Sequence, residues 1–136
     1  MIKKLTILIL ISCCVSCHKS SNQPACGTQA CTLSYATIGV AFADKNGAAV
    51  TVKNYSAVNQ RTHEKLMPPG YYDTVPGYYI VANDSMRDQF STEGDDVLIT
   101  ATHPTTNQTK TVTFKISGGC NCHVDKVSGV SPVVFD

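Results

Sequence analysis

The chain has 136 residues and a formal net charge of +1, and only 15% of its residues are charged. This length allows one domain, and the near-neutral charge gives no electrostatic reason to expect a nucleic acid partner. Apolar residues make up 43% of the chain, which is enough to build a core and excludes wholesale disorder. Seven cysteines without a tryptophan favour an exported protein over a cytosolic enzyme.

Residues 1–16 have the order of a lipoprotein signal peptide. Lys3 and Lys4 precede an apolar run over residues 5–11, and small residues and cysteines follow it. The apolar run is about a third of the ~20 residues that a transmembrane helix needs. We therefore expect export and removal of this segment.

Two cysteines are candidates for lipidation. The segment LISC, which ends at Cys13, resembles the bacterial lipobox, and CVSC, which ends at Cys17, is a looser second match. Local residues favour Cys13, whereas the segment length and the polar residues that follow favour Cys17. We expect a lipid on Cys17, with Cys13 as the alternative, and a flexible tether over residues 17–31. The implied location is the bacterial cell envelope, bound to the outer membrane on its periplasmic or surface face.

From residue 32 onward, apolar residues alternate with polar or small ones, which is the period of half-buried strands. An Asn46-Gly47 pair predicts a hairpin, and two Pro-Gly pairs, at 69–70 and 76–77, predict type II turns. Residues 85–90 are expected to form one irregular helical turn. The alternation predicts strands over residues 37–42, 50–53, 78–82, 97–102, 111–116 and 133–135.

About seven strands at this spacing favour an all-β fold, a single antiparallel β-sandwich over residues 32–136. The lipobox, the Asn46-Gly47 hairpin and the Cys-rich segment over residues 118–129 resemble those of small bacterial lipoproteins with an Ig-like, transthyretin-like or carboxypeptidase-regulatory-like domain. The resemblance implies a domain that binds or braces rather than catalyses, although a fold alone assigns no function.

Four cysteines belong to the exported domain. Because an oxidising compartment favours disulfides, and a bridge between Cys120 and Cys122 would be strained, we expect both to pair with Cys26 and Cys31. We favour Cys26 with Cys122 and Cys31 with Cys120, and the crossed pairing is the alternative. A second hypothesis is a zinc or copper site at Cys120, Cys122 and His123. Apart from that hypothesis, no cofactor is expected.

The chain contains none of the common catalytic motifs, such as HExxH, a Walker loop or GxSxG, so we predict that it is not an enzyme. The binding candidates are four tyrosines in nine residues, whose rings suit a sugar or a protein partner. Adjacent residues of a strand point to opposite faces, so one tyrosine of each pair is expected to fill the core. These tyrosines are Tyr71, Tyr72, Tyr78 and Tyr79.

Overall fold

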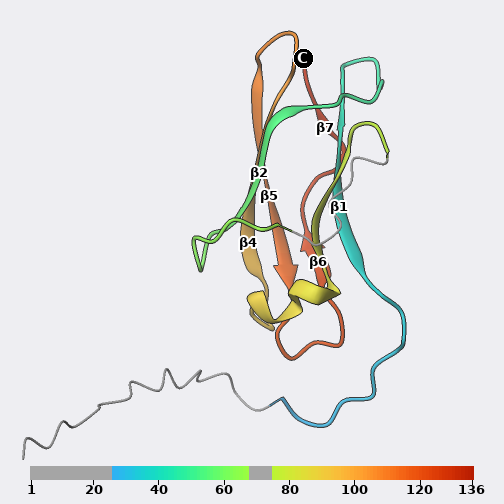
Figure 1. Cartoon of the computed structure of the whole chain (residues 1–136), viewed down its shortest axis with the longest axis vertical. Helices are drawn as coiled ribbons and strands as arrows, with labels where there is room; N and C mark the ends of the chain where they lie inside the picture. Colours follow the sequence, from blue (N-terminus) through green and yellow to red (C-terminus); the bar gives the residue numbers. More distant parts are fainter. Residues whose placement is uncertain (1–25, 68–74) are drawn as a thin grey trace, which may run out of the picture.

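The computed structural model describes residues 26–67 and 75–136, which form two facing β-sheets and one short helix (Figure 1). One sheet has the strand order β3-β1-β7 and the other β2-β4-β5-β6. The strands pair antiparallel except β1 with β7. The predicted all-β sandwich of about seven strands is thus confirmed. The elements are β1 (Thr37–Ala43), β2 (Lys53–Asn59), β3 (Tyr78–Asn83), the 3-10 helix η1 (Asp84–Gln89), β4 (Asp95–Thr102), β5 (Thr109–Ser117), β6 (Asp125–Ser128) and β7 (Val133–Val134).

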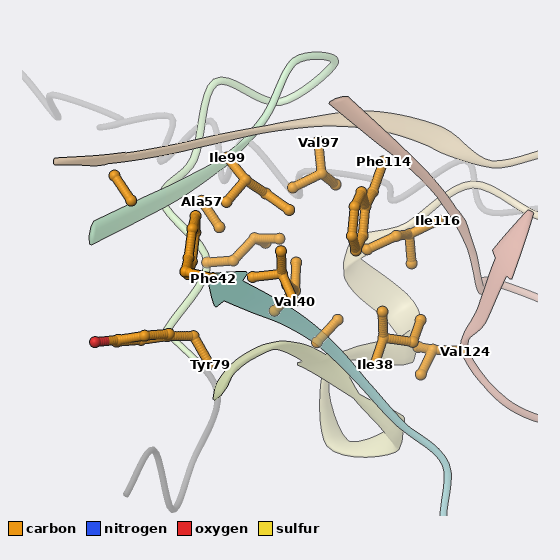
Figure 2. Packing of buried hydrophobic residues seen from close by; sticks show 14 of the residues in the cluster. Ile38, Val40, Phe42, Ala57, Tyr79, Val97, Ile99, Phe114, Ile116 and Val124 are labelled. Carbon is orange, nitrogen blue, oxygen red and sulfur yellow. The ribbon is translucent and has the colours of Figure 1, made fainter. Parts of the chain in front are cut away.

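The core lies between the two sheets and follows the period-two pattern of the sequence (Figure 2). Alternate residues of β1, β4 and β5 point inward, and none of those named below is more than 7% exposed. Removal of such side chains from water is the main stabilising contribution, about 1.5–3 kcal/mol each. They are Ile38, Val40, Phe42, Val97, Ile99, Ala101, Phe114 and Ile116.

Both turns that rest on a described glycine form as expected. The Asn46-Gly47 turn places Gly47 at a φ of +83°, and the Asp44 carboxylate accepts the N–H groups of Asn46 and Ala48. At the second Pro-Gly pair, the Tyr78 N–H donates to the Val75 carbonyl across a type II turn. The first Pro-Gly pair lies outside the described residues.

The return strand expected at residues 50–53 is wrong. After a single bridge between Ala43 and Ala49, the chain leaves β1 and enters the other sheet as β2. The reason is that β3 takes the same edge of β1: the Phe42 N–H donates to the Gly77 carbonyl. The predicted turn at Asn46-Gly47 is therefore present, but the predicted hairpin is wrong, because the chain passes from one sheet to the other.

Two further strands were not expected. All of β6 is exposed, so it shows no alternation, and it pairs with the edge of β5. The second half of β2 was also not predicted, because its residues do not alternate clearly between apolar and polar.

No helix in the described part of the chain is long and apolar enough to cross a membrane. The signal peptide and both candidate lipidation sites, Cys13 and Cys17, lie outside the described residues.

Candidate functional site

Two disulfides join the residues before β1 to the loop between β5 and β6. We call residues 26–36 the arm. Cys26 bonds to Cys120 and Cys31 to Cys122, with Cα–Cα distances of 5.2 and 5.3 Å. The favoured pairing was therefore wrong, and the crossed alternative is present. Both arm cysteines fall within the expected tether, yet they are cross-linked to the domain.

The direction of the arm explains the pairing. Thr32, which follows Cys31, hydrogen-bonds to His123, which follows Cys122. The arm thus runs in the same direction as the loop, whereas the favoured pairing required it to run in the opposite direction. Figure 1 shows the arm passing around the end of the sandwich that carries η1 before it turns into β1.

His123 connects the arm to the start of η1. Its Nδ1 lies 2.6 Å from Asp84 Oδ2, and its Nε2 lies 2.8 Å from Thr32 Oγ1. The Asp84 carboxylate also accepts the backbone N–H groups of Ala36 and Val124. The side chains of His123 and Asp84 are 26% and 14% exposed, so the pair is partly shielded from water. The result is a continuous chain of hydrogen bonds from hydroxyl to imidazole to carboxylate.

The Asp84 carboxylate is the charged end of this chain. Burial by itself raises the pKa of Asp84, but the hydrogen bonds from Ala36, His123 and Val124 outweigh burial and lower it. An ionised carboxylate only accepts hydrogen bonds. The hydrogen between Asp84 and His123 is therefore carried by the imidazole, on Nδ1. In a neutral imidazole with its hydrogen on Nδ1, Nε2 carries a lone pair that faces the Thr32 hydroxyl.

The sequence gives no sign of this cluster. His123 was predicted only as a possible metal ligand, and no motif links it to Thr32 or Asp84. Thr32 and His123 are 91 residues apart, and His123 and Asp84 are 39 apart. No local spacing joins them: the arm brings Thr32 to His123, and the loop between β5 and β6 brings His123 to Asp84.

The zinc or copper hypothesis depends on free thiolates at Cys120 and Cys122. In the structure both sulfur atoms are in disulfides, and His123 is engaged by Asp84 and Thr32. Within residues 26–67 and 75–136, no group of three or more His, Cys, Asp or Glu side chains is placed to hold a metal ion.

The tyrosines separate into different roles. Tyr79 is only 4% exposed, its hydroxyl bonds to the backbone of Val52, and its ring stacks on Tyr55 at 4.9 Å. The assignment of Tyr79 as a binding residue was therefore wrong, because it is the member of its pair that fills the core. Tyr78 points outward and is 40% exposed. Tyr71 and Tyr72 lie outside the described residues.

Tyr78 lies between two hollows on the outer face of the β3-β1-β7 sheet. Its ring covers Gly39 of β1, where a side chain would collide with it. The hollows have volumes of about 410 and 370 Å³, and Tyr78 lines both. We call this surface the Tyr78 groove. Its lining comprises Ala36, Thr37, Ile38, Gly39, Val124, Asp125 and Lys126 on one side, and Ala41, Phe42, Ala43, Gly47, Ala49, Val75, Pro76, Gly77, Ser131 and Pro132 on the other.

The groove and the His123 cluster adjoin each other. Ala36 and Val124 line the larger hollow, and their N–H groups hold the Asp84 carboxylate. The larger hollow is thus lined both by Tyr78 and by residues that bind the Asp84 carboxylate. Comparison of the chain with protein-family models, with curated proteins and with solved structures gives no match.

Proposed function

We propose that this protein is a lipid-anchored module of the bacterial cell envelope that binds a glycan through the Tyr78 groove. The observation that carries the proposal is the exposed Tyr78 ring, which lies between two open hollows above small residues of β1. Binding sites are typically concave, largely apolar and supplied with a few polar groups. The smaller hollow is mainly apolar, and the larger one carries polar groups from Thr37, Asp125 and Lys126.

The cell-envelope part of the proposal draws on the disulfides and on the sequence. Disulfides between segments more than 90 residues apart persist in oxidising compartments such as the periplasm or the cell surface. The lipobox-like segments before Cys13 and Cys17 supply the expected anchor. Because the arm enters at the η1 end, the anchor would hold the domain by that end, with the C-terminus at the opposite end (Figure 1).

A glycan suits the groove better than an extended apolar partner. Tyr78 offers a flat ring with a hydroxyl, which combines apolar area with a hydrogen-bonding group. Asp125 and Lys126 line the same hollow and are exposed. The Asp125 carboxylate can accept hydrogen bonds from sugar hydroxyls, whereas Lys126 Nζ lies 4.9 Å from the centroid of the Phe114 ring. The absence of a side chain at Gly39 leaves room for the Tyr78 ring to lie over the sheet.

The test is retention of the detergent-solubilised mature protein on immobilised bacterial cell-wall and surface polysaccharides. We expect the native protein to be retained, and Tyr78→Ala to lose at least about tenfold in affinity, which corresponds to about 1.4 kcal/mol. Tyr35→Ala is the matched control, because Tyr35 is 63% exposed on the arm and does not line the groove. Equal affinity of the Tyr78 variant, or capture of a protein partner with no glycan retained, would contradict the proposal.

A further inference from the structure

The hydrogen bonds of Thr32, His123 and Asp84 have the direction that nucleophilic catalysis requires. When His123 is neutral, Nδ1 donates to Asp84 and Nε2 accepts, so the hydrogen of that 2.8 Å contact comes from the Thr32 hydroxyl. A hydroxyl that donates to an imidazole, which in turn donates to a carboxylate, is the arrangement of a nucleophile, its base and the group that orients the base.

Neighbouring bonds hold each member of this chain in place. The Cys31–Cys122 disulfide immediately precedes both Thr32 and His123, and it fixes their backbones with a Cα–Cα distance of 5.3 Å between the cysteines. Two backbone N–H groups fix the Asp84 carboxylate. Such positioning reduces the entropy that must be lost before reaction.

We propose that Thr32, His123 and Asp84 form an acyl-transfer site that hydrolyses carboxylic esters. Thr32 is exposed to solvent, and the side chain of His123 is 26% exposed, so an ester carbonyl can approach both from outside. The proposal is independent of glycan binding in the Tyr78 groove, and it departs from the sequence-based expectation of a protein without enzymatic activity.

The reaction has two steps. In the first, Thr32 Oγ1 attacks the carbonyl carbon while His123 Nε2 takes the hydroxyl proton; the bond to the alcohol oxygen breaks, and the alcohol leaves with that proton. In the second, water loses a proton to Nε2 and attacks the acyl group on Thr32. The carboxylic acid is released, and the proton returns to Thr32. The Asp84 carboxylate stabilises the imidazolium that forms in both steps.

The test is hydrolysis of p-nitrophenyl acetate by the mature protein with its disulfides intact. We expect a rate at least tenfold above that of Thr32→Val, which keeps the shape of the side chain but lacks the hydroxyl. Thr32→Ser should retain the activity, and so should the matched control Ser34→Ala on the same arm. A fluorophosphonate probe should label Thr32, as located by peptide mass mapping.

A merely structural cluster would behave differently. Equal rates for the native protein and Thr32→Val, or labelling at another residue, would overturn the proposal. His123→Gln gives a second measurement and should reduce the rate to that of Thr32→Val, provided that its melting temperature shows a folded protein. The double variant Cys31→Ser/Cys122→Ser keeps the other disulfide and should lose most of the rate; a native rate there would contradict the positioning role of the disulfide.

Discussion

Asp95 is a buried carboxylate at the start of β4, and three side chains satisfy it. Oδ1 accepts from Arg61 Nε at 2.8 Å and from the Ser91 hydroxyl at 2.7 Å, while Oδ2 accepts from Asn59 at 2.8 Å. Burial by itself raises the pKa of Asp95, but these bonds outweigh it and lower the pKa to about 2. The network ties the turn after β2 and the residues after η1 to β4.

This carboxylate makes stability depend on acidic pH. The pKa of Asp95 is about 2 in the folded protein and 3.8 in the unfolded chain, which corresponds to about 2 kcal/mol. Because the folded pKa is depressed, this stability is fully present above pH 3.8 and is lost as the pH falls to 2. We expect Asp95→Asn to lower the free energy of unfolding at pH 7 and to flatten its decline on acidification, as measured by urea unfolding between pH 7 and 2.

The control is Asp96→Asn, on the exposed face of the same strand. It should retain the acid dependence of the native protein, including any contribution from Asp84 and Asp136, whose pKa values are also lowered. If both variants showed the same pH dependence as the native protein, the account of Asp95 would be wrong.

The burial of single residues could be predicted from the sequence where apolar and polar residues alternate along a strand. Ile38, Val40 and Phe42 were correctly placed in the core by their spacing. The same rule states that one tyrosine of an adjacent pair faces inward, but it does not say which. Tyr79 faces inward because it shares the inner face of β3 with Val81, a detail that depends on the register with β1.

At the scale of elements, Gly47 and Gly77 both have a positive φ, but only Gly77 also lacks space for a side chain. Gly47 has a φ of +83°, and a Cβ there would meet nothing within 4 Å. Gly77 has a φ of +72°, and a Cβ there would lie 2.8 Å from the Phe42 carbonyl oxygen. Both turns require a backbone conformation that costs other residues about 1–2 kcal/mol.

We therefore expect Gly47→Ala to reduce the free energy of unfolding by about 1 kcal/mol. Gly77→Ala should cost clearly more, because the added methyl group also pushes β1 and β3 apart where they pair. Thermal and urea unfolding of the two variants, side by side with the native protein, provide the comparison. Equal losses in the free energy of unfolding would contradict this prediction, because they would show that the backbone around Phe42 moves away from the added methyl group without cost.

The elements that sequence predicted well are those with an alternating face. β4 and β5 alternate because one face of each packs on the core. β6 lies at the edge of its sheet with every residue exposed, so it leaves no pattern to detect. The crossing from β1 to β2 was missed because Val50 and Val52 alternate like a strand, although β3 already occupies the edge that they would need.

For the whole molecule, the two disulfides close loops with sequence separations of 94 and 91 residues. The chain-entropy model assigns about 4–5 kcal/mol to the first bridge across a loop of this length. The second bridge adds much less, because the first already holds the same segments together. Sequence alone could not decide the pairing, since it depends on the direction in which the arm passes the loop.

This redundancy predicts non-additive effects of cysteine replacement. Cys26→Ser/Cys120→Ser should lower the free energy of unfolding by only about 2 kcal/mol, whereas replacing all four cysteines should lower it by about 6–7 kcal/mol. Guanidinium unfolding of the double and quadruple variants gives both values. If the losses in free energy of unfolding from removing each disulfide alone added up to the loss from removing both, the two disulfides would not be restraining the same segments.

Two disulfides fix the arm, and we propose that the mature protein is anchored by a lipid at the start of the chain that leads into it. The most direct test is the intact mass of the protein extracted from bacterial membranes, with alkylation before and after reduction. We predict a chain that starts at Cys17 with a diacyl- or triacylglyceryl group, and four thiols that react only after reduction. A chain that starts at Cys13 would instead retain Cys14 and Cys17 after the lipidated residue. An acyl-free chain with four freely reactive thiols in the domain would contradict both the anchor and the fixed arm.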